Sequence, residues 1–276
     1  MASSYPHLTI LVVIYNESPD TSASIKAVVA LDGILGSNTI IWDNSIASQS
    51  TSFHSFFANA GFSIEYINTP ENLSLSVIYN RVADSVTDDG FLLILDQDTV
   101  LPPNYLKSFF DAVYEHPDIK LFVPTIRVGR KLISPSPFFS GWGLAWRRMR
   151  IGRHSTRHIT IINSGLFASL ALFQSDGVRY DERLKLYGTD TDFFRSYSRR
   201  EASFYILPVV VDHDLSFNTA DIGNKAAKIS QMFAANRIIY APDGLFIRAG
   251  VAVVELIVRL RYALRYRSLL FFRVAD

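Results

Sequence analysis

Short apolar runs alternate with segments of helical periodicity along the first half of the chain. The runs lie at residues 9–15, 39–42, 63–67 and 92–95. Runs of this length, rich in β-branched and aliphatic side chains, predict strands that are buried on both faces of a parallel sheet. Helices are predicted between the strands at residues 24–31, 53–59 and 72–83. The alternation indicates an α/β fold with a mostly parallel, Rossmann-like sheet flanked by helices.

Polar side chains follow three of these predicted strands. They are Tyr15, Asn16 and Glu17 after the first strand, Asp43 and Asn44 after the second, and Asp96, Gln97 and Asp98 after the fourth. Because right-handed crossovers bring the carboxyl ends of parallel strands to one edge of the sheet, we expect these side chains to converge on one crevice. Such a crevice suits a nucleotide, with Asp43 placed to hydrogen-bond the base or the ribose.

Two aspartates separated by one residue, Asp96 and Asp98, follow a strand of aliphatic residues. Neighbouring carboxylates repel each other unless a cation or hydrogen-bond donors compensate their charge. Carboxylate oxygens suit Mg²⁺ or Mn²⁺, which takes substrate phosphates as further ligands. A solvated turn is the alternative for an isolated Asp-x-Asp, and the polar residues at the neighbouring strand ends favour the metal and nucleotide site.

Two common nucleotide-binding motifs are missing from the sequence. No Gly-x-Gly-x-x-Gly follows the first strand, and no Gly-Lys-Ser/Thr loop occurs anywhere in the chain. A bound dinucleotide cofactor and a P-loop ATPase are therefore both disfavoured.

The second half of the chain is less regular. Residues 121–124 and 204–211 predict two further strands, while residues 134–146, rich in Pro, Phe, Gly and Trp, predict a loop with exposed aromatic side chains. Asp190 is expected to open a helix that holds Asp192 in its first turn, where acids interact favourably with the helix dipole. An acid pair that only caps a helix is the alternative. His213 follows the last predicted strand and has an acid on each side.

The composition excludes several classes of protein. The 276 residues have a formal net charge of +1, which argues against a dedicated nucleic-acid binder. The absence of cysteine excludes a disulfide framework and a thiolate zinc site, and it fits a cytoplasmic protein. The N-terminus lacks the features of a signal peptide, and no stretch reaches the roughly 18 uncharged apolar residues of a spanning helix.

The C-terminal segment differs in character from the rest. Residues 245–274 are mostly apolar and aromatic and carry six arginines against a single acid, Glu255. A basic, aromatic helix of this kind predicts docking on an anionic membrane surface. A helix packed on the core or in an oligomer interface is the alternative, because the arginines do not fall on one stripe. We divide the chain into a domain at 1–218 and a helical extension at 219–276.

The order of these motifs resembles that of the family 2 glycosyltransferases of the GT-A fold, and most closely their rhamnosyltransferase-like branch. The matching segments, spread over residues 8–215, are 15–17, 42–45, 71–81, 95–99, 163–165, 180–182 and 189–195. The most specific of them is Leu95-Asp96-Gln97-Asp98-Thr99, which looks like the Asp-Gln-Asp-Ser signature of that branch. The sequence departs from the pattern of the family at two places. Ser74 and Ser76 stand where the family has glycines, and Gly188 stands where it has an acid. These departures bear on the identity of the donor sugar and of the acceptor.

The resemblance implies an inverting, metal-dependent transfer of a sugar from a nucleotide diphosphate to a glycan hydroxyl. Asp190 would be the catalytic base, with Asp192 as the competing candidate, and Asp98 and His213 would hold Mg²⁺ or Mn²⁺. Asp43 would contact the base of the donor. The other donor-binding residues would be Tyr15, Asn16, Glu17, Asn44, Asn80, Asp96 and Gln97.

The resemblance also suggests the substrates and the place of the reaction. The first choice of donor is dTDP-rhamnose, with UDP-hexoses second, and the acceptor would be a polyprenyl-linked glycan in bacterial surface polysaccharide (O-antigen or capsule) synthesis. The protein would be cytoplasmic, peripheral on the inner face of the cell membrane. A sugar-nucleotide pyrophosphorylase would need a Gly-rich basic loop in place of Tyr15-Asn16-Glu17-Ser18. A non-catalytic nucleotide-sugar-binding protein would not need both the metal acid and the base.

Overall fold

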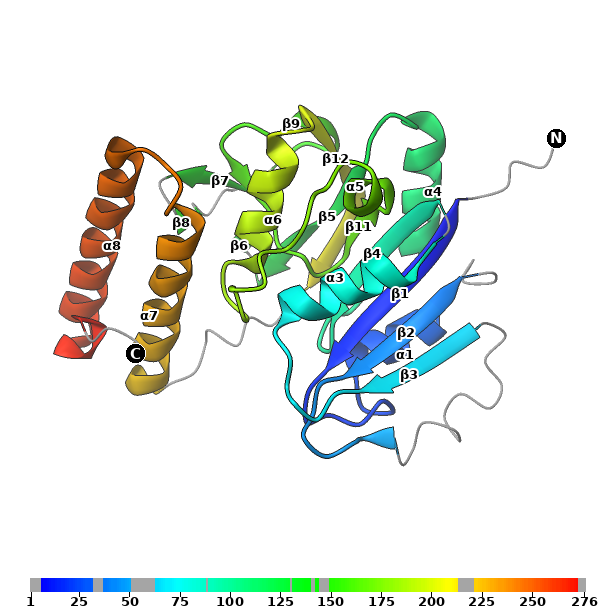
Figure 1. Cartoon of the computed structure of the whole chain (residues 1–276), viewed down its shortest axis with the longest axis horizontal. Helices are drawn as coiled ribbons and strands as arrows, with labels where there is room; N and C mark the ends of the chain where they lie inside the picture. Colours follow the sequence, from blue (N-terminus) through cyan, green and yellow to red (C-terminus); the bar gives the residue numbers. More distant parts are fainter. Residues whose placement is uncertain are drawn as a thin grey trace.

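A sheet of nine strands runs through the part of the chain that the computed structural model describes, with helices on both faces (Figure 1). The described residues are 6–31, 37–50, 63–87, 89–129, 131–139, 142–143, 149–212 and 221–272. The helix predicted at residues 53–59 lies outside them.

The first half of the sheet is parallel and has the strand order β3-β2-β1-β4. These strands are β1 (His7–Ile14), β2 (Asn38–Asp43), β3 (Ser63–Asn68) and β4 (Gly90–Asp96). The helices α1 (Ala23–Val29) and α3 (Leu75–Ser85) connect them. The four strands and two of the helices predicted from the apolar runs are therefore confirmed.

The second half of the sheet continues from β4 in the order β11-β5-β12-β9, and β6 pairs with β5. These strands are β11 (Leu166–Ser169), β5 (Leu121–Val128), β12 (Ser203–Asp212), β9 (Gly152–Ser155) and β6 (Lys131–Ser134). β11 is antiparallel to both β4 and β5, while β12 is parallel to β5. The predicted strands at residues 121–124 and 204–211 are confirmed, and the mostly parallel α/β sheet is confirmed with them.

The loop predicted at residues 134–146 is replaced by strands where the structure describes this segment. β7 (Ser136–Phe139) pairs with β8 (Trp142–Gly143) and with β10 (Ile159–Thr160) in a separate sheet. The backbone N–H of Phe138 donates a hydrogen bond of 2.8 Å to the carbonyl of His158. The loop prediction is wrong here because aromatic residues favour strands, and this preference outweighs the Pro and Gly content.

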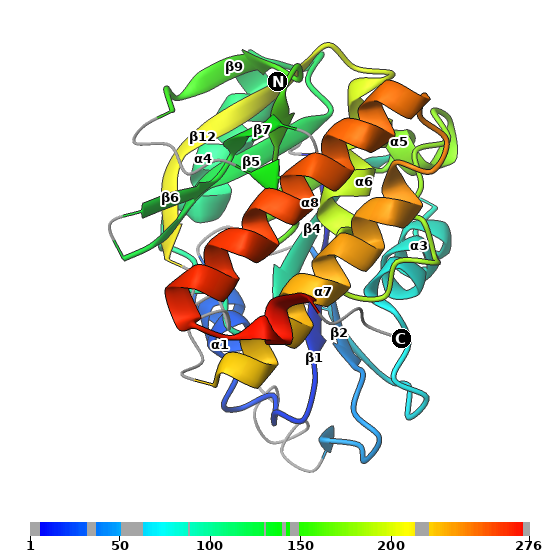
Figure 2. The ribbon, with the colours of Figure 1, turned by 90° about the vertical axis from the view of Figure 1, so that its left-hand side faces the viewer.

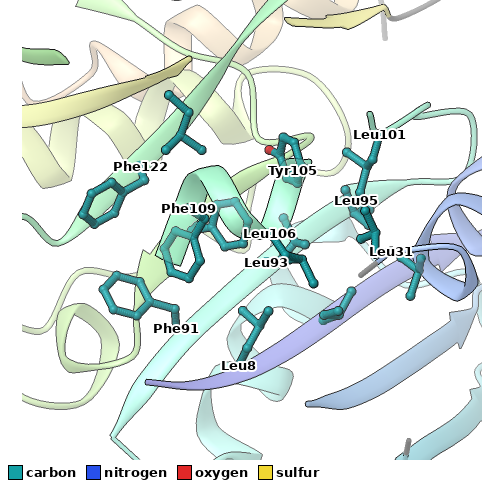
Figure 3. Close-up of a cluster of buried hydrophobic side chains, with 14 of the residues drawn as sticks. Leu8, Leu31, Phe91, Leu93, Leu95, Leu101, Tyr105, Leu106, Phe109 and Phe122 are labelled. Atoms are coloured by element: carbon teal, nitrogen blue, oxygen red, sulfur yellow. The ribbon is translucent and has the colours of Figure 1, made fainter. Parts of the chain in front are cut away.

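Alternate residues of the central strands point to opposite faces of the sheet, and each face has its own layer of helices. Leu93 and Leu95 of β4 pack under α1 and α4 (Tyr105–Glu115), where Leu106 and Phe109 meet them (Figure 3). Leu92 and Ile94 pack on the other face against α3, α5 (Ala171–Gln174) and α6 (Thr189–Ser198). The next residue on the second face is Asp96, so the alternation directs this carboxylate toward α3 and α6.

Two antiparallel helices follow the sheet at one side of the molecule (Figure 1). They are α7 (Ile222–Ile239) and α8 (Leu245–Tyr266), followed by the 3-10 helix η3 (Leu269–Phe272). Their presence confirms the helical extension. None of the helices in the described segments is long and apolar enough to cross a membrane.

Candidate active site

The turn from Asp96 to Thr99, at the carboxyl end of β4, is held from both sides by serines. The Ser24 hydroxyl of α1 lies within hydrogen-bonding distance of the carbonyls of Asp96 and Thr99, and it accepts from the Thr99 N–H at 2.9 Å. On the other side, Ser164 Oγ accepts from the Asp96 N–H at 3.1 Å and bonds the Thr99 hydroxyl. Because the backbone of the turn is fixed in this way, its side chains are presented from a rigid frame.

The loops that follow β1, β2 and β4 are tied to one another. The Tyr15 N–H donates to Gln97 Oε1 at 2.7 Å, and the Asn16 N–H donates to Ser45 Oγ at 2.7 Å. Asn16 has a φ of 51°, a left-handed conformation that asparagine adopts more readily than most residues. The three loops therefore meet at one edge of the sheet.

Two acids from different loops, Glu17 and Asp98, interact at this edge. Partial burial raises the pKa of the Glu17 carboxyl, the negative charge of Asp98 raises it further, and Lys26 opposes the shift. Asp98 itself is exposed. Two repelling carboxylates with hard oxygen atoms fit a divalent cation that also takes phosphate and water ligands.

The described residues do not by themselves gather three metal-ligating side chains. His213, the second predicted ligand, lies outside the described residues. Asp212, the last described residue before it, pairs with Val100, which is two positions after Asp98. The end of β12 is thus beside the Asp96–Thr99 turn.

Asp43 lies on the opposite face of the sheet from Asp96 and is fully buried, with 0% of its surface exposed. Its carboxylate accepts hydrogen bonds from the Ser45 N–H at 3.0 Å, the Gln49 N–H at 2.7 Å and the Tyr66 hydroxyl. Burial and then this hydrogen bond raise the pKa of Tyr66 to about 12, so the phenol stays protonated. Both oxygens of Asp43 therefore hold the loop at residues 44–49 in place.

Asn44 is also engaged by the chain itself. Its amide nitrogen donates to the Leu73 carbonyl at 2.8 Å and to Asn72 Oδ1, and its oxygen accepts from the Leu73 N–H at 2.8 Å. These bonds join the end of β2 to the segment that precedes α3. Asn44 thus fixes the position of these two segments at this edge of the sheet.

Asn80 has the same kind of role on α3. Its amide donates to the Tyr180 carbonyl and to Glu182 Oε1, each at 3.0 Å, and it accepts from the Tyr180 N–H at 3.1 Å. Asn80 therefore fastens the segment that leads to α6 onto α3.

Asp190 lies in the first turn of α6, close enough to Asp96 at the end of β4 for the charge of Asp96 to act on it. Burial raises the pKa of its carboxyl to about 6, and the negative charge of Asp96 adds to the shift. The Thr191 N–H, which donates to Asp190 Oδ1 at 2.7 Å, opposes it. A carboxyl group with this pKa is ionised at neutral pH and is basic enough to take a proton from a positioned hydroxyl.

The competing acid, Asp192, has different surroundings. Burial raises the pKa of its carboxyl, and the charge of Asp181 raises it further, while Arg195 and Arg199 lower it. The charge of Asp96, which acts on Asp190, is not among these causes. The charge of Asp96 thus acts on the pKa of Asp190, whereas the charge of Asp181 acts on that of Asp192.

Two buried tyrosines accompany the acid pair. Burial raises the pKa of Tyr79 and of Tyr180 well above the usual range, and the charges of Asp96 and Asp190 add to this effect. Their ring centroids are 4.9 Å apart, and the Tyr180 hydroxyl donates to Asn163 Oδ1 at 3.3 Å. Tyr79 is absent from the predicted site because an aromatic residue on the apolar face of a helix indicates only core packing.

The start of α6 is fixed by the C-terminal helices. Gly188, which precedes the helix, has a φ of 83°, and a Cβ atom there would lie 2.8 Å from the Cβ of Ala235 and 2.9 Å from Ile239 Cδ1 on α7. Farther along α6, Arg195 donates to Asp243 Oδ2 at 2.8 Å and lies over the ring of Tyr240, 4.2 Å from its centroid. The helix that carries Asp190 is therefore attached to the turn between α7 and α8.

A comparison with protein families identifies the family of this chain. The model described as "Glycosyl transferase family 2" matches residues 9–178, more than half of the chain. The chain belongs to glycosyl transferase family 2. The match includes β1 to β4, the Asp96–Thr99 turn and Ser164, whereas Asp190 and the C-terminal helices lie beyond it.

Several solved structures have folds similar to that of this chain. The crystal structure of S. aureus TarS has a TM-score of 0.59 at 13% sequence identity, covering 85% of this glycosyltransferase and 42% of the TarS chain. Residues 1–349 of TarS in complex with UDP-GlcNAc give 0.58 at 12% identity, covering 83% and 66%. GalNAc-T7 with UDP, GalNAc and Mn²⁺ gives 0.56 at 11% identity, covering 82% and 48%.

At these identities the similarity shows the fold, which is the GT-A fold of TarS. This glycosyltransferase spans less than half of the full TarS chain and of the GalNAc-T7 chain. No curated protein matches its sequence.

Proposed function

We propose that this glycosyltransferase moves a sugar from a nucleotide diphosphate to a glycan hydroxyl with inversion at the anomeric carbon. The position of Asp190, with a pKa raised to about 6 and within the field of Asp96, carries the proposal. The acceptor oxygen forms a bond to the anomeric carbon as the bond to the diphosphate oxygen breaks. The proton of the acceptor hydroxyl passes to Asp190. One in-line displacement of this kind inverts the configuration and needs a single base.

Asp98, together with His213, would hold Mg²⁺ or Mn²⁺ beside the diphosphate. A bound divalent cation neutralises the charge that develops on the leaving diphosphate. The exposed carboxylate of Asp98 and its repulsion of Glu17 support this assignment. Such an ion needs only one or two protein carboxylates when phosphates and water complete its ligands.

The remaining residues act on the donor in two ways. Tyr15, Asn16, Glu17, Asp96 and Gln97 line the edge of the sheet and contact the donor directly. Asp43, Asn44 and Asn80 act through the segments that their hydrogen bonds hold. These segments surround the base of the bound nucleotide and the two acids Asp96 and Asp190.

Two observations support the proposed choice of donor. The segment Asp96-Gln97-Asp98-Thr99 resembles the rhamnosyltransferase-like branch and favours dTDP-rhamnose. The complexes of TarS and GalNAc-T7 with UDP favour a UDP-hexose as the second candidate. The acceptor would be a polyprenyl-linked glycan of a bacterial surface polysaccharide, met at the cytoplasmic face of the membrane.

Calorimetry of dTDP, UDP and GDP, each with and without Mn²⁺, tests the donor site. We expect metal-dependent binding of one nucleotide, and Asp98→Asn should weaken that binding only in the presence of metal. If Mn²⁺ strengthens nucleotide binding to Asp98→Asn as much as it does to the unchanged protein, the metal assignment is contradicted.

Single-turnover assays of Asp190→Asn test whether Asp190 is the catalytic base. We expect turnover to fall by roughly 10²- to 10⁴-fold, with nucleotide affinity retained, because the variant lacks only the proton acceptor. Asp192→Asn, a substitution of the same kind two residues away, should keep most of the activity. An equal loss of turnover and of nucleotide affinity in Asp190→Asn would contradict the assignment.

A further inference from the structure

Helix α8 presents an apolar stripe to the outside of the molecule. The stripe consists of exposed residues on one side of the helix: Phe246, Ala249, Val253, Leu256, Ile257, Leu260 and Leu264. Phe246 is 94% exposed and Leu264 is 78% exposed. At a rise of 1.5 Å per residue the stripe is about 27 Å long. Figure 2 shows α8 in front of the other labelled elements, with none of them over it.

The opposite side of the same helix is already used for packing. Val251 joins a core cluster with Ala235 and Ile239 of α7, and Val258 joins one with Phe233 of α7 and Phe271 of η3. The outer stripe is therefore a second apolar surface. An exposed apolar surface of this length marks a site of interaction.

Two exposed arginines border this stripe. Arg261 and Arg265 follow Ile257 at intervals of four residues, so they border the stripe, and all three are exposed. The single acid of α8, Glu255, bonds Arg237 and Arg259, each at 2.9 Å. Residues 221–272 contain eight basic and three acidic residues, although the whole chain has a net charge of only +1.

The charges beside the stripe indicate which kind of partner covers it. A second copy of α8 would offer these arginines no acidic partner, because the single acid of the helix, Glu255, already bonds Arg237 and Arg259. An anionic membrane offers acyl chains to the stripe and negative headgroups to the arginines.

We propose that α8 lies in the plane of an anionic membrane, with the stripe toward the acyl chains and Arg261 and Arg265 among the headgroups. The surface is defined by α8 alone, so the proposal is independent of the reaction proposed for the Asp190 site.

Sedimentation of the full chain with vesicles tests this surface. We expect binding to vesicles of phosphatidylcholine and phosphatidylglycerol in equal parts, little binding to phosphatidylcholine alone, and weaker binding at high salt. Replacing both leucines, Leu256→Gln with Leu264→Gln, should reduce partitioning at least about tenfold, since two large apolar side chains no longer enter the membrane. Replacing both arginines, Arg261→Gln with Arg265→Gln, should reduce it about tenfold on the anionic vesicles only.

The matched control is Tyr114→Gln, which removes an exposed aromatic residue from α4, far from α8 in sequence, and should leave partitioning unchanged. Thermal unfolding and nucleotide calorimetry on every variant separate loss of the membrane surface from loss of the fold or of the donor site. Absent binding to the anionic vesicles, or equal binding by the leucine variant, overturns the proposal. So does a dimer in sedimentation equilibrium that the leucine variant converts to a monomer, because a second copy then covers the stripe.

Discussion

A single carboxyl group, that of Asp190, connects the electrostatics of the site with a measurable pH dependence. Its pKa is raised to about 6, mainly by burial and then by the charge of Asp96. Because only the ionised carboxylate accepts a proton, turnover should rise as the pH increases through about 6 and should be level above it. Initial rates with saturating donor, measured between about pH 5 and 8, give the profile. Asp192→Asn should retain this rise of turnover with pH. If the rise disappears in that variant, the catalytic base is Asp192 and not Asp190.

The same pKa also predicts a cost in stability. The carboxyl group is more acidic in the unfolded chain, so the folded state binds its proton more tightly, and folding loses stability as the pH rises from about 4 through about 6. Asp190→Asn removes this loss and should raise the free energy of unfolding at pH 7 by up to about 3 kcal/mol. The gain should vanish near pH 4. Denaturant titrations at both pH values measure it, and a less stable variant at pH 7 would show that the carboxylate has a strong partner in the fold.

Ser164 supports the Asp96–Thr99 turn, where we propose that Asp98 holds the metal ion. Its hydroxyl accepts from the Asp96 N–H and bonds the Thr99 hydroxyl. Ser164→Ala should cost about 1–2 kcal/mol of stability and weaken metal-dependent nucleotide binding several-fold, as the turn loosens. Ser134→Ala is the control, because Ser134 is equally buried and accepts from the Ile162 N–H at 2.9 Å away from this turn. Equal nucleotide affinities in the two variants would contradict the supporting role.

Individual site residues differ in how far the sequence reveals them. The pattern of polar residues after buried strands identifies Asp43, Asn44 and Asp96 alike. It does not tell which of them face the crevice, because that depends on which face of the sheet each occupies and on the loop that follows. Ser24 gives no signal at all, since serine at the start of a helix is common for reasons of capping alone.

At the scale of elements, the start of α6 depends on one glycine. Gly188→Ala would force a side chain into a left-handed conformation and into contact with Ala235 and Ile239 of α7. We expect a loss of about 2–4 kcal/mol in stability and a marked fall in turnover, because the helix that carries Asp190 must shift. Gly129→Ala is the matched control: its φ is also positive, at 55°, but a Cβ atom there meets nothing within 4 Å. Similar losses in both variants would show that backbone strain alone is responsible.

The elements themselves were predictable where the apolar pattern was strong. The runs at residues 9–15 and 92–95 correspond to β1 and β4 within two residues at each end. Helix α4 was missed although Leu106, Phe109, Phe110 and Val113 have helical spacing. The direction of β11 was not predictable, because an apolar run has the same composition whether the strand is parallel or antiparallel.

For the whole molecule, the division at residue 218 separates segments that share a core. Leu184, before α6, packs with Ala235 and Ile239 of α7, and the Arg195–Asp243 ion pair crosses the same boundary with both side chains largely buried. The sequence indicated a helical extension from its composition. It did not indicate that the extension holds α6 in place, because those contacts join residues far apart in the chain.

The antiparallel strand β11 also has a consequence for the order in which the protein folds. β11 lies between β4 and β5, although it follows both in the chain, and Leu166 pairs with Ile94 across 72 positions of sequence. Contacts between such distant residues form slowly, because a long loop must close before they contribute. Only β1, β2 and β3 are joined by shorter connections, because β1 pairs with β4 across 83 positions, Leu11 with Ile94. We therefore expect β1 to β3 to form first, and β4, with an open edge for β11, to join them later. Ser164 reaches the Asp96–Thr99 turn only when β11 enters that edge, so the active site is completed among the last steps of folding.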